Sequence, residues 1–183
     1  MSRIGKKHIV IPAGVTVDIN KNVITVSGPL GTLKRTINRA LKVKTENNEI
    51  IIERPDDLPE TKAQHGLYRQ LINNMIVGAS KGFTRALVVN GVGYKLTQNG
   101  ENISIDVGFS HPIAFNAVPG IKLAAKGVDI TVSGADKELV GQVAAKIRAI
   151  RPVEPYHAYG IRYSDEVVIK KQGKASGKAT GKK

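Results

Sequence analysis

An internal repeat places the same order of strand and helix patterns in both halves of the chain. Residues 22–28 (NVITVSG) align with residues 102–108 (NISIDVG), an offset of 80 positions. The same offset, within one residue, also aligns Leu33 with Ile113, Leu41 with Ile121, and residues 50–52 with residues 130–132. A longer literal match, ITVSG at 24–28 and 130–134, breaks the order of the elements, and we treat it as chance. Coincidental strand spacing is the alternative, but the ordered match favours two copies of one module.

Each half predicts short strands followed by one helix. Alternating apolar residues between turn residues predict strands over residues 15–19, 23–26, 32–37, 41–45, 49–53, 84–89, 94–97, 103–107, 113–116, 121–125 and 129–132. Apolar residues at helical spacing predict helices over about 60–78 and 136–150. Asp57 is predicted to cap the first helix in a capping box with Glu60. We therefore expect an α+β protein of two tandem homologous modules, each an antiparallel sheet packed against one main helix, plus a basic C-terminal tail.

The expected boundaries follow from the repeat and from a change in composition. Residues 1–81 are predicted to form the N-terminal α+β module and residues 82–152 the C-terminal one. Residues 153–183 are predicted to be a basic aromatic loop and a Lys-rich tail, within which residues 162–171 include the apolar run 167–169 and could form an extra strand. The residues after 172 are Gly, Lys, Ala, Ser and Thr, a composition that cannot build a core.

The composition argues against several classes of function. The chain has no cysteine, which excludes disulfides, thiolate zinc sites and cysteine nucleophiles. Its four histidines are far apart in sequence, and no acid–base pair or nucleophile stands out, so we expect no metal, no cofactor, no small-molecule substrate and no catalysis. Residues 173–178 have one residue too few for a phosphate-binding loop. The apolar run 9–11 stops at Pro12, too short for a signal peptide or a membrane span, so a cytoplasmic protein is expected.

Positive charge is concentrated at the C-terminal end. Residues 146–183 hold ten Lys and Arg against three acids, a net +7 out of the chain's formal +13. Three of the five tyrosines lie in the same stretch. Because cations bind phosphates and aromatic rings stack on unpaired bases, this mixture indicates a nucleic-acid surface, with single-stranded or folded RNA favoured over duplex DNA.

The candidate RNA-binding residues are those cations and rings, together with one turn in the second module. They are Arg148, Arg151, Tyr156, His157, Tyr159, Arg162, Tyr163, Lys170, Lys171 and Lys174, and, in the turn, Gly91, Tyr94 and Lys95. Cations near a helix end also have a purely structural explanation. Likewise, the tyrosines could anchor a loop core, and the Lys tail could be a solubilising appendage. A DNA-binding architectural protein and a small hydrolase are the alternative functions, but a strongly basic recognition helix and a catalytic constellation are both missing from the sequence.

The motifs of this C-terminal stretch also resemble those of a known family. Residues 151–156 (RPVEPY) and 160–163 (GIRY) are similar to the C-terminal signature of the bacterial large-subunit ribosomal protein six family. Further matching stretches run in order along nearly the whole chain: residues 2–5, 26–31, 73–75, 91–94 and 108–112. His157 and Tyr159 stand where the family usually has lysines.

The resemblance implies two tandem homologous α+β domains, in agreement with the repeat. It also implies a structural protein of the large subunit that binds large-subunit rRNA, mainly through the C-terminal domain and tail. The implied position is near the translation-factor-binding region and the base of the stalk. The implied partners are therefore rRNA and neighbouring ribosomal proteins, with translation factors nearby, and no membrane.

Overall fold

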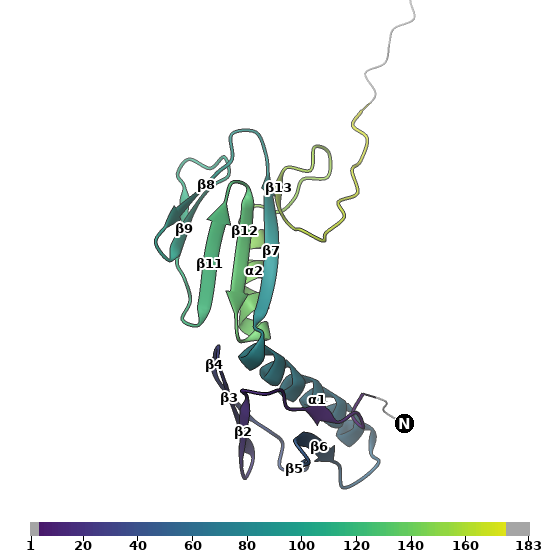
Figure 1. Ribbon diagram of the computed structural model, residues 1–183. Coiled ribbons are helices and arrows are strands. Elements are labelled where there is room, and N and C mark those ends of the chain that lie inside the picture. Colours follow the sequence, from purple (N-terminus) through teal and green to yellow (C-terminus); the bar gives the residue numbers. More distant parts are fainter. Residues whose placement is uncertain (1–3, 175–183) are drawn as a thin grey trace, which may run out of the picture. The chain divides into compact units, whose positions relative to one another are not determined.

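The computed structural model describes residues 4–174 (Figure 1). Its contacts divide the chain into two compact units that interleave in sequence. The first unit contains the residues up to Thr84 together with Pro119–Lys122 and Ser133–Gly141. The second contains Arg85–Val118, Leu123–Val132 and the residues from Gln142 onward. The predicted division at residues 81 and 152 stays a prediction.

The first half forms two small antiparallel sheets and one helix. One sheet has the strand order β2-β3-β4 and the other β1-β6-β5. The elements are β1 (Ile9–Val10), β2 (Thr16–Asn20), β3 (Val23–Gly28), β4 (Gly31–Thr36), β5 (Lys42–Glu46), β6 (Glu49–Glu53) and α1 (Pro59–Ser80). The predicted strands and helix are therefore present, and β1, only two residues long, is an addition.

The core of this half lies where α1 contacts β3, β4 and β6. Alternate residues of β3 point inward, so that Ile24 and Val26 are almost fully buried. Ile50 of β6 and Ile72 of α1 are buried with them. This core is mostly Ile and Val, with Leu41, Met75 and Ala79, as expected for a chain with 4% aromatic residues.

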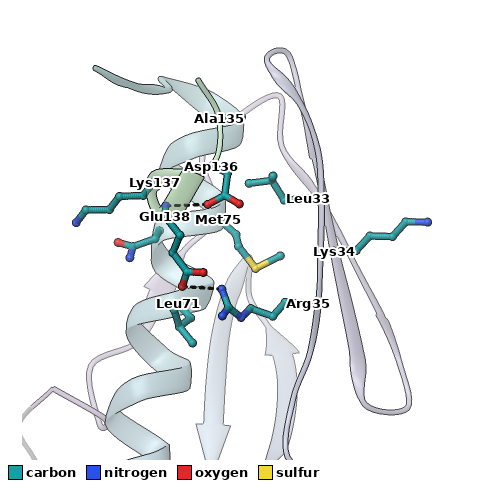
Figure 2. A pocket seen from close by; sticks show the side chains of 10 residues that line it. Leu33, Lys34, Arg35, Leu71, Met75, Ala135, Asp136, Lys137 and Glu138 are labelled. Atoms are coloured by element: carbon teal, nitrogen blue, oxygen red, sulfur yellow. Dashed lines mark hydrogen bonds and ion pairs between the residues drawn. The ribbon is translucent and has the colours of Figure 1, made fainter. Parts of the chain in front are cut away.

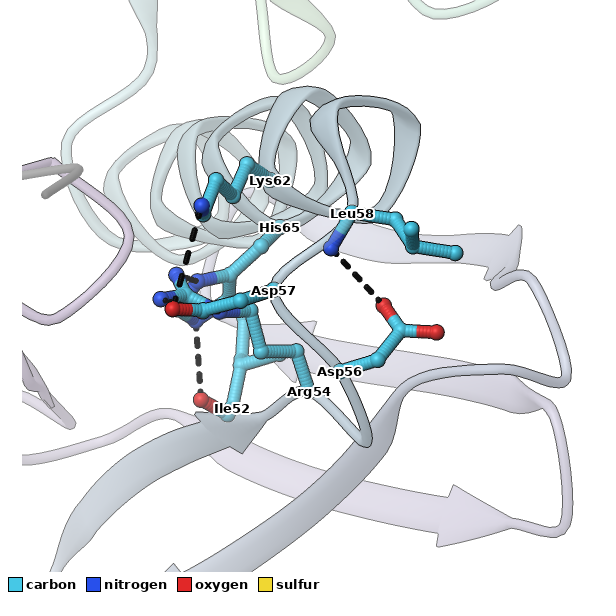
Figure 3. Close-up of polar contacts among 7 residues, drawn as sticks. All are labelled: Ile52, Arg54, Asp56, Asp57, Leu58, Lys62 and His65. Carbon is cyan, nitrogen blue, oxygen red and sulfur yellow. Dashed lines mark hydrogen bonds and ion pairs between the residues drawn. The ribbon is translucent and has the colours of Figure 1, made fainter.

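The predicted cap of α1 is wrong in one respect (Figure 3). The capping position is Leu58, and no side chain bonds to the first turn, although Pro59 and Glu60 lie in that turn as predicted. Asp57 is engaged elsewhere, because its carboxylate accepts hydrogen bonds from the guanidinium of Arg54 at 2.9 and 2.5 Å. These bonds are the main reason why the pKa of Asp57 lies below its ordinary value.

The same arginine faces a buried histidine behind the helix start (Figure 3). His65 is 3% exposed, and its Nε2–H donates to the carbonyl of Ile52 at 2.9 Å. Nδ1 of His65 lies 3.3 Å from the Arg54 guanidinium. A side chain at Gly5 would collide with this ring, at 2.4 Å from Nδ1. His65 is thus a structural residue whose polar atoms are satisfied within the first unit.

The second half repeats the element order and the strand pairing of the first. Its sheets have the orders β10-β9-β8 and β11-β12-β7-β13, which match β4-β3-β2 and β5-β6-β1 with β13 added. The elements are β7 (Phe83–Asn90), β8 (Lys95–Asn99), β9 (Asn102–Asp106), β10 (Ile113–Phe115), β11 (Ile121–Lys126), β12 (Asp129–Gly134), α2 (Lys137–Ile150) and β13 (Gly160–Tyr163). The predicted α+β class and the duplication are confirmed, with the refinement that each module has two sheets.

The literal ITVSG match falls on strands that are not equivalent. Residues 24–28 lie in β3, the middle of a three-stranded sheet, whereas residues 130–134 lie in β12 of the four-stranded sheet. The order-preserving alignment instead places β3 on β9, and both are the central strands of their sheets. Treating the literal match as chance is therefore consistent with the topology.

The extra C-terminal strand lies earlier than the sequence predicts. It runs from Gly160 to Tyr163 and pairs antiparallel with β7, with Ile161 opposite Val89. The physical reason is burial: Ile161 is fully buried, while Val167 and Ile169 are 88% and 83% exposed. α2 lies against one face of the four-stranded sheet (Figure 1) and buries Val143 and Ile147.

One pocket lies within the first unit (Figure 2). Its lining residues come from β4, α1 and the stretch around the start of α2, and they are Leu33, Lys34, Arg35, Leu71, Asn74, Met75, Ala135, Asp136, Lys137 and Glu138. Arg35 and Glu138 form an ion pair at 2.8 Å across it, and Asp136 accepts a hydrogen bond from the Glu138 amide at 2.8 Å. These contacts hold the start of α2.

Candidate nucleic-acid interface

The C-terminal candidates gather around the end of α2 and β13 in the second unit. Arg148 is in the last turn of α2, and Arg162 and Tyr163 are on β13. The loop of residues 151–159 joins these elements, and residues 164–174 continue from β13 as the yellow-green segment in Figure 1. We call residues 148–174 the C-terminal surface.

Backbone hydrogen bonds fix the loop of residues 151–159. The Glu154 amide donates to the Tyr159 carbonyl at 2.9 Å, and the Ala158 amide donates to the Glu154 carbonyl at 3.0 Å. Ala158 is 7% exposed and takes a left-handed conformation with φ 63°. Its carbonyl accepts a bond from the Asn90 side chain at 3.0 Å. The loop is therefore held from within and anchored to the end of β7.

Gly160 brings the start of β13 against the chain that leaves α2. Its φ is +139°, and an added Cβ would lie 2.7 Å from the Pro152 carbonyl oxygen and 2.8 Å from Cα of Val153. Only glycine fits such an approach without strain. The Ile161 amide then donates to the Arg151 carbonyl at 2.8 Å. These contacts close the base of the loop.

Glu166 organises the cations at the end of α2. Arg148 binds its carboxylate with two hydrogen bonds, at 2.9 Å from Nε and 2.5 Å from Nη2. The Tyr163 amide donates to the same carboxylate at 3.2 Å, and Arg162 donates to the Glu166 carbonyl at 3.1 Å. The hydrogen bonds from Arg148 hold the pKa of Glu166 below its ordinary value, and Glu166 in turn raises the pKa of Arg148. Arg148, one of the predicted RNA-binding residues, therefore has the Glu166 carboxylate as an internal partner for its guanidinium.

Tyr163 lies between two arginines. The guanidinium of Arg85 is 4.5 Å from its ring centre and that of Arg148 is 5.7 Å away, which are cation–π distances. Arg85 also pairs with Asp165 at 3.1 Å. The sequence did not single out Arg85, because only the pairing of β13 with β7 brings it beside residue 163. Tyr163 therefore has a packing role within this cluster.

Other predicted residues lie on the open side of the C-terminal surface. Lys170, Lys171 and Lys174 are exposed, and the Lys171 amide donates to the Pro155 carbonyl at 2.9 Å, which ties this segment to the loop. Arg151 is exposed with its guanidinium 5.5 Å from the Phe109 ring centre. The residues that follow Lys174 in the predicted tail lie outside the described part of the chain.

Three rings project from the loop itself. Tyr156 is 50% and Tyr159 36% exposed. His157 and Tyr159 stack, with ring centres 5.4 Å apart and planes 20° from parallel. Nδ1 of His157 lies 3.3 Å from a carboxylate oxygen of Glu154. The loop thus presents aromatic surface rather than filling a core with it.

The turn predicted as a second candidate begins beside the loop. Asn90, which bonds to the loop, directly precedes Gly91. An added Cβ at Gly91 would lie 2.4 Å from the Tyr94 ring, so the glycine makes room for a partly exposed tyrosine. Lys95 is exposed at the start of β8, opposite Asp106. The end of β7 is therefore held beside the loop, while Tyr94 precedes β8 and Lys95 begins it.

Comparisons with known proteins decide the family. The family model described as "Ribosomal protein L6" matches residues 11–82 and 90–164, one match on each module. The chain belongs to the ribosomal protein L6 family. The large ribosomal subunit protein uL6 of Fusobacterium nucleatum is 46% identical over 177 residues, covering 96% of this chain and all of the relative. The uL6 proteins of Syntrophomonas wolfei, 48% identical over 179 residues, and Oleidesulfovibrio alaskensis, 46% identical over 178, are also similar; they cover 97% of this chain and 100% and 99% of their own lengths.

Membership of the L6 family confirms three predictions made from the sequence. It confirms the resemblance, and it confirms a location on the ribosome and a structural rather than enzymatic protein. Within the described residues, no helix is long and apolar enough to cross a membrane, and no three or more His, Cys, Asp or Glu lie together as ligands for a metal ion.

Proposed function

We propose that this chain is a structural constituent of the large ribosomal subunit that binds large-subunit rRNA through the C-terminal surface. The neighbours would be other ribosomal proteins, and the position would be near the translation-factor-binding region and the stalk base, as the family resemblance implies. The mechanism is electrostatic docking of exposed cations on phosphates, with the folded modules holding rRNA segments in register.

The observation that carries this proposal is the contrast, within the C-terminal surface, between cations paired with acids and cations that have no acidic partner. Arg85 and Arg148 pair with Asp165 and Glu166. Within the described residues, no acidic group pairs with the side chains of Lys170, Lys171 or Lys174. The acids of this region therefore pair with Arg85 and Arg148. The lysine side chains remain available to bind an external anion.

Salt-dependent binding tests the proposal. The full-length chain is titrated with large-subunit rRNA and with duplex DNA over a salt series, as wild type and as Lys170→Ala/Lys171→Ala. Each lost phosphate contact flattens the slope of log K against log salt by roughly 0.7–0.9. We expect the double variant to bind rRNA more weakly, with a slope flatter by roughly 1.4–1.8 for two contacts. Substitution is preferable to truncation, because removing residues 160–163 would take β13 out of its sheet.

The matched control is Lys122→Ala/Lys126→Ala. These lysines are exposed at β11 and their loss changes the net charge equally. We expect this control to leave rRNA binding nearly unchanged. Equal losses in both variants, or equal wild-type affinity for rRNA and DNA at every salt concentration, would mean that binding follows net charge alone, and the proposal would fail. Selective binding to DNA would instead favour an architectural DNA-binding protein.

A further inference from the structure

The stacked rings of His157 and Tyr159 have no role in the electrostatic docking proposed for the C-terminal surface. The His157 side chain is 67% exposed although Tyr159 covers one face of its ring. The opposite face is therefore open to solvent. Tyr156 adds a third exposed ring one position earlier. Aromatic rings that project from a fixed loop, instead of packing into a core, form a surface suited to another flat group.

The backbone of this loop holds the two rings in place before any ligand arrives. Ala158, which lies between them, is buried, has φ 63°, and is bonded through both its amide and its carbonyl. The Tyr159 carbonyl accepts the bond from the Glu154 amide. Little ordering is left to occur on binding, which is the condition under which a contact contributes most to affinity.

The local electrostatics favour a base over a phosphate. Glu154 places its carboxylate 3.3 Å from Nδ1 of His157, so a phosphate approaching that edge would meet a negative charge. A neutral, planar nucleobase that lies on the open ring face meets no such repulsion. Every base has a π-face, and stacking on an aromatic side chain requires the base to be unpaired.

We propose that His157 and Tyr159 form a stacking platform for one unpaired base of the rRNA. This inference rests on the proposed rRNA binding and specifies one contact within it. The neighbouring lysines hold the phosphates, while the platform selects RNA in which a base is flipped out of its helix. The aromatic pair occupies the positions where the resemblance leads one to expect lysines.

The test separates stacking from charge by comparing three variants of the full-length chain. His157→Ala/Tyr159→Ala removes the platform, His157→Phe/Tyr159→Phe keeps flat rings, and His157→Lys/Tyr159→Lys replaces stacking with charge. Each is titrated over a salt series with large-subunit rRNA and with a blunt-ended RNA duplex that has no unpaired base. Thermal unfolding of each variant checks that the module is folded.

Loss of one stacked base predicts rRNA binding weaker by about 5- to 150-fold in the alanine variant, with an unchanged salt slope. The phenylalanine variant should bind rRNA within about threefold of wild type by the same argument. The lysine variant should steepen the slope by roughly 0.7–0.9 for each new contact. On the blunt duplex, wild type and the alanine variant should bind alike.

Two results would overturn the platform and leave rRNA binding intact. One is unchanged rRNA affinity in the alanine variant while the Lys170→Ala/Lys171→Ala variant is impaired. The other is a loss accompanied by a flatter salt slope, which identifies a phosphate contact. A wild-type chain that fails to prefer rRNA over duplex DNA would overturn the proposed function itself, and this outcome is read from a different comparison.

Discussion

At the scale of single residues, Glu166 shows how an acid can support a cationic surface. Its carboxylate accepts bonds from Arg148 and from the Tyr163 amide. A carboxylate that accepts such bonds is stabilised in its charged form. The consequence for the surface is that α2, β13 and the segment leading to Lys170 are joined at one point.

This arrangement predicts how stability depends on pH. Because the pKa of Glu166 is lower in the folded state than its ordinary value of 4.5, the unfolded state binds the proton more readily. The stabilisation is therefore present above that ordinary value and is lost as the pH falls through the folded pKa. Glu166→Gln should lower the free energy of unfolding by about 1 kcal/mol at neutral pH.

Chemical denaturation of wild type and Glu166→Gln over a pH series measures the effect. The gap between them should close as the solution is acidified, since both then carry an uncharged side chain. Glu101→Gln is the control, because Glu101 is exposed and forms no ion pair within the described part of the chain. A gap that stays constant down to about pH 2.5 would show that the charge of Glu166 is not what stabilises the fold.

At the scale of elements, β13 connects the second sheet to the candidate interface. Ile161 is the strand's deepest side chain, fully buried and paired opposite Val89. A buried Ile truncated to Ala typically loses about 2–5 kcal/mol of stability. Ile161→Ala should therefore cost about that much and should lower rRNA affinity indirectly, because the loop of residues 151–159 is closed by the same strand.

The matched substitution is Ile169→Ala, which makes the same chemical change at a side chain that is 83% exposed. It should change stability by no more than about 0.5 kcal/mol. Urea unfolding of both variants makes the comparison. Equal destabilisation of the two would mean that Ile169 packs against the module, contrary to its exposure in the structure.

The sequence predicts a helix or strand correctly when the pattern that marks it lies in neighbouring residues. The helices and the strands that alternate apolar and polar residues were predicted because burial on one face imposes a period of 3.6 or 2. β1 is two residues long, too short to show any period. β13 was placed too late because its apolar neighbours, Val167 and Ile169, are a stronger local signal than Ile161. Only the pairing with β7, a distant strand, decides between them.

The candidate RNA-binding site, too, could be predicted only where the signal is local. Composition alone identified the stretch rich in cations and rings, because net charge needs no structure to be counted. It could not separate Arg148, which pairs with Glu166, from Lys170, which has an exposed side chain. Nor could it find Arg85, which reaches the ring of Tyr163 only through the sheet. The predicted Asp57 cap failed for a similar reason, since Arg54 competes for the carboxylate.

At the scale of the whole molecule, the two copies of the module share one fold but differ in what is attached to them. The element order and pairing are the same in both halves, but only the second half carries β13, the loop and the basic segment beyond it. Duplication thus supplied a stable framework twice, and the C-terminal extension of one copy supplied the charged and aromatic surface. In the function proposed above, this extension makes most of the contacts with rRNA.

The most direct measurement is ultraviolet cross-linking of the protein to rRNA in assembled large subunits that contain it, followed by identification of the linked peptides. If the C-terminal surface binds rRNA, we expect cross-links concentrated in residues 148–174, with the tyrosines of the loop among the linked residues. Strands of the first module that also contain glycine and lysine, such as β4, serve as the internal comparison for the number of cross-links. Cross-links confined to the first module, with none in residues 148–174, would show that the C-terminal surface does not bind rRNA.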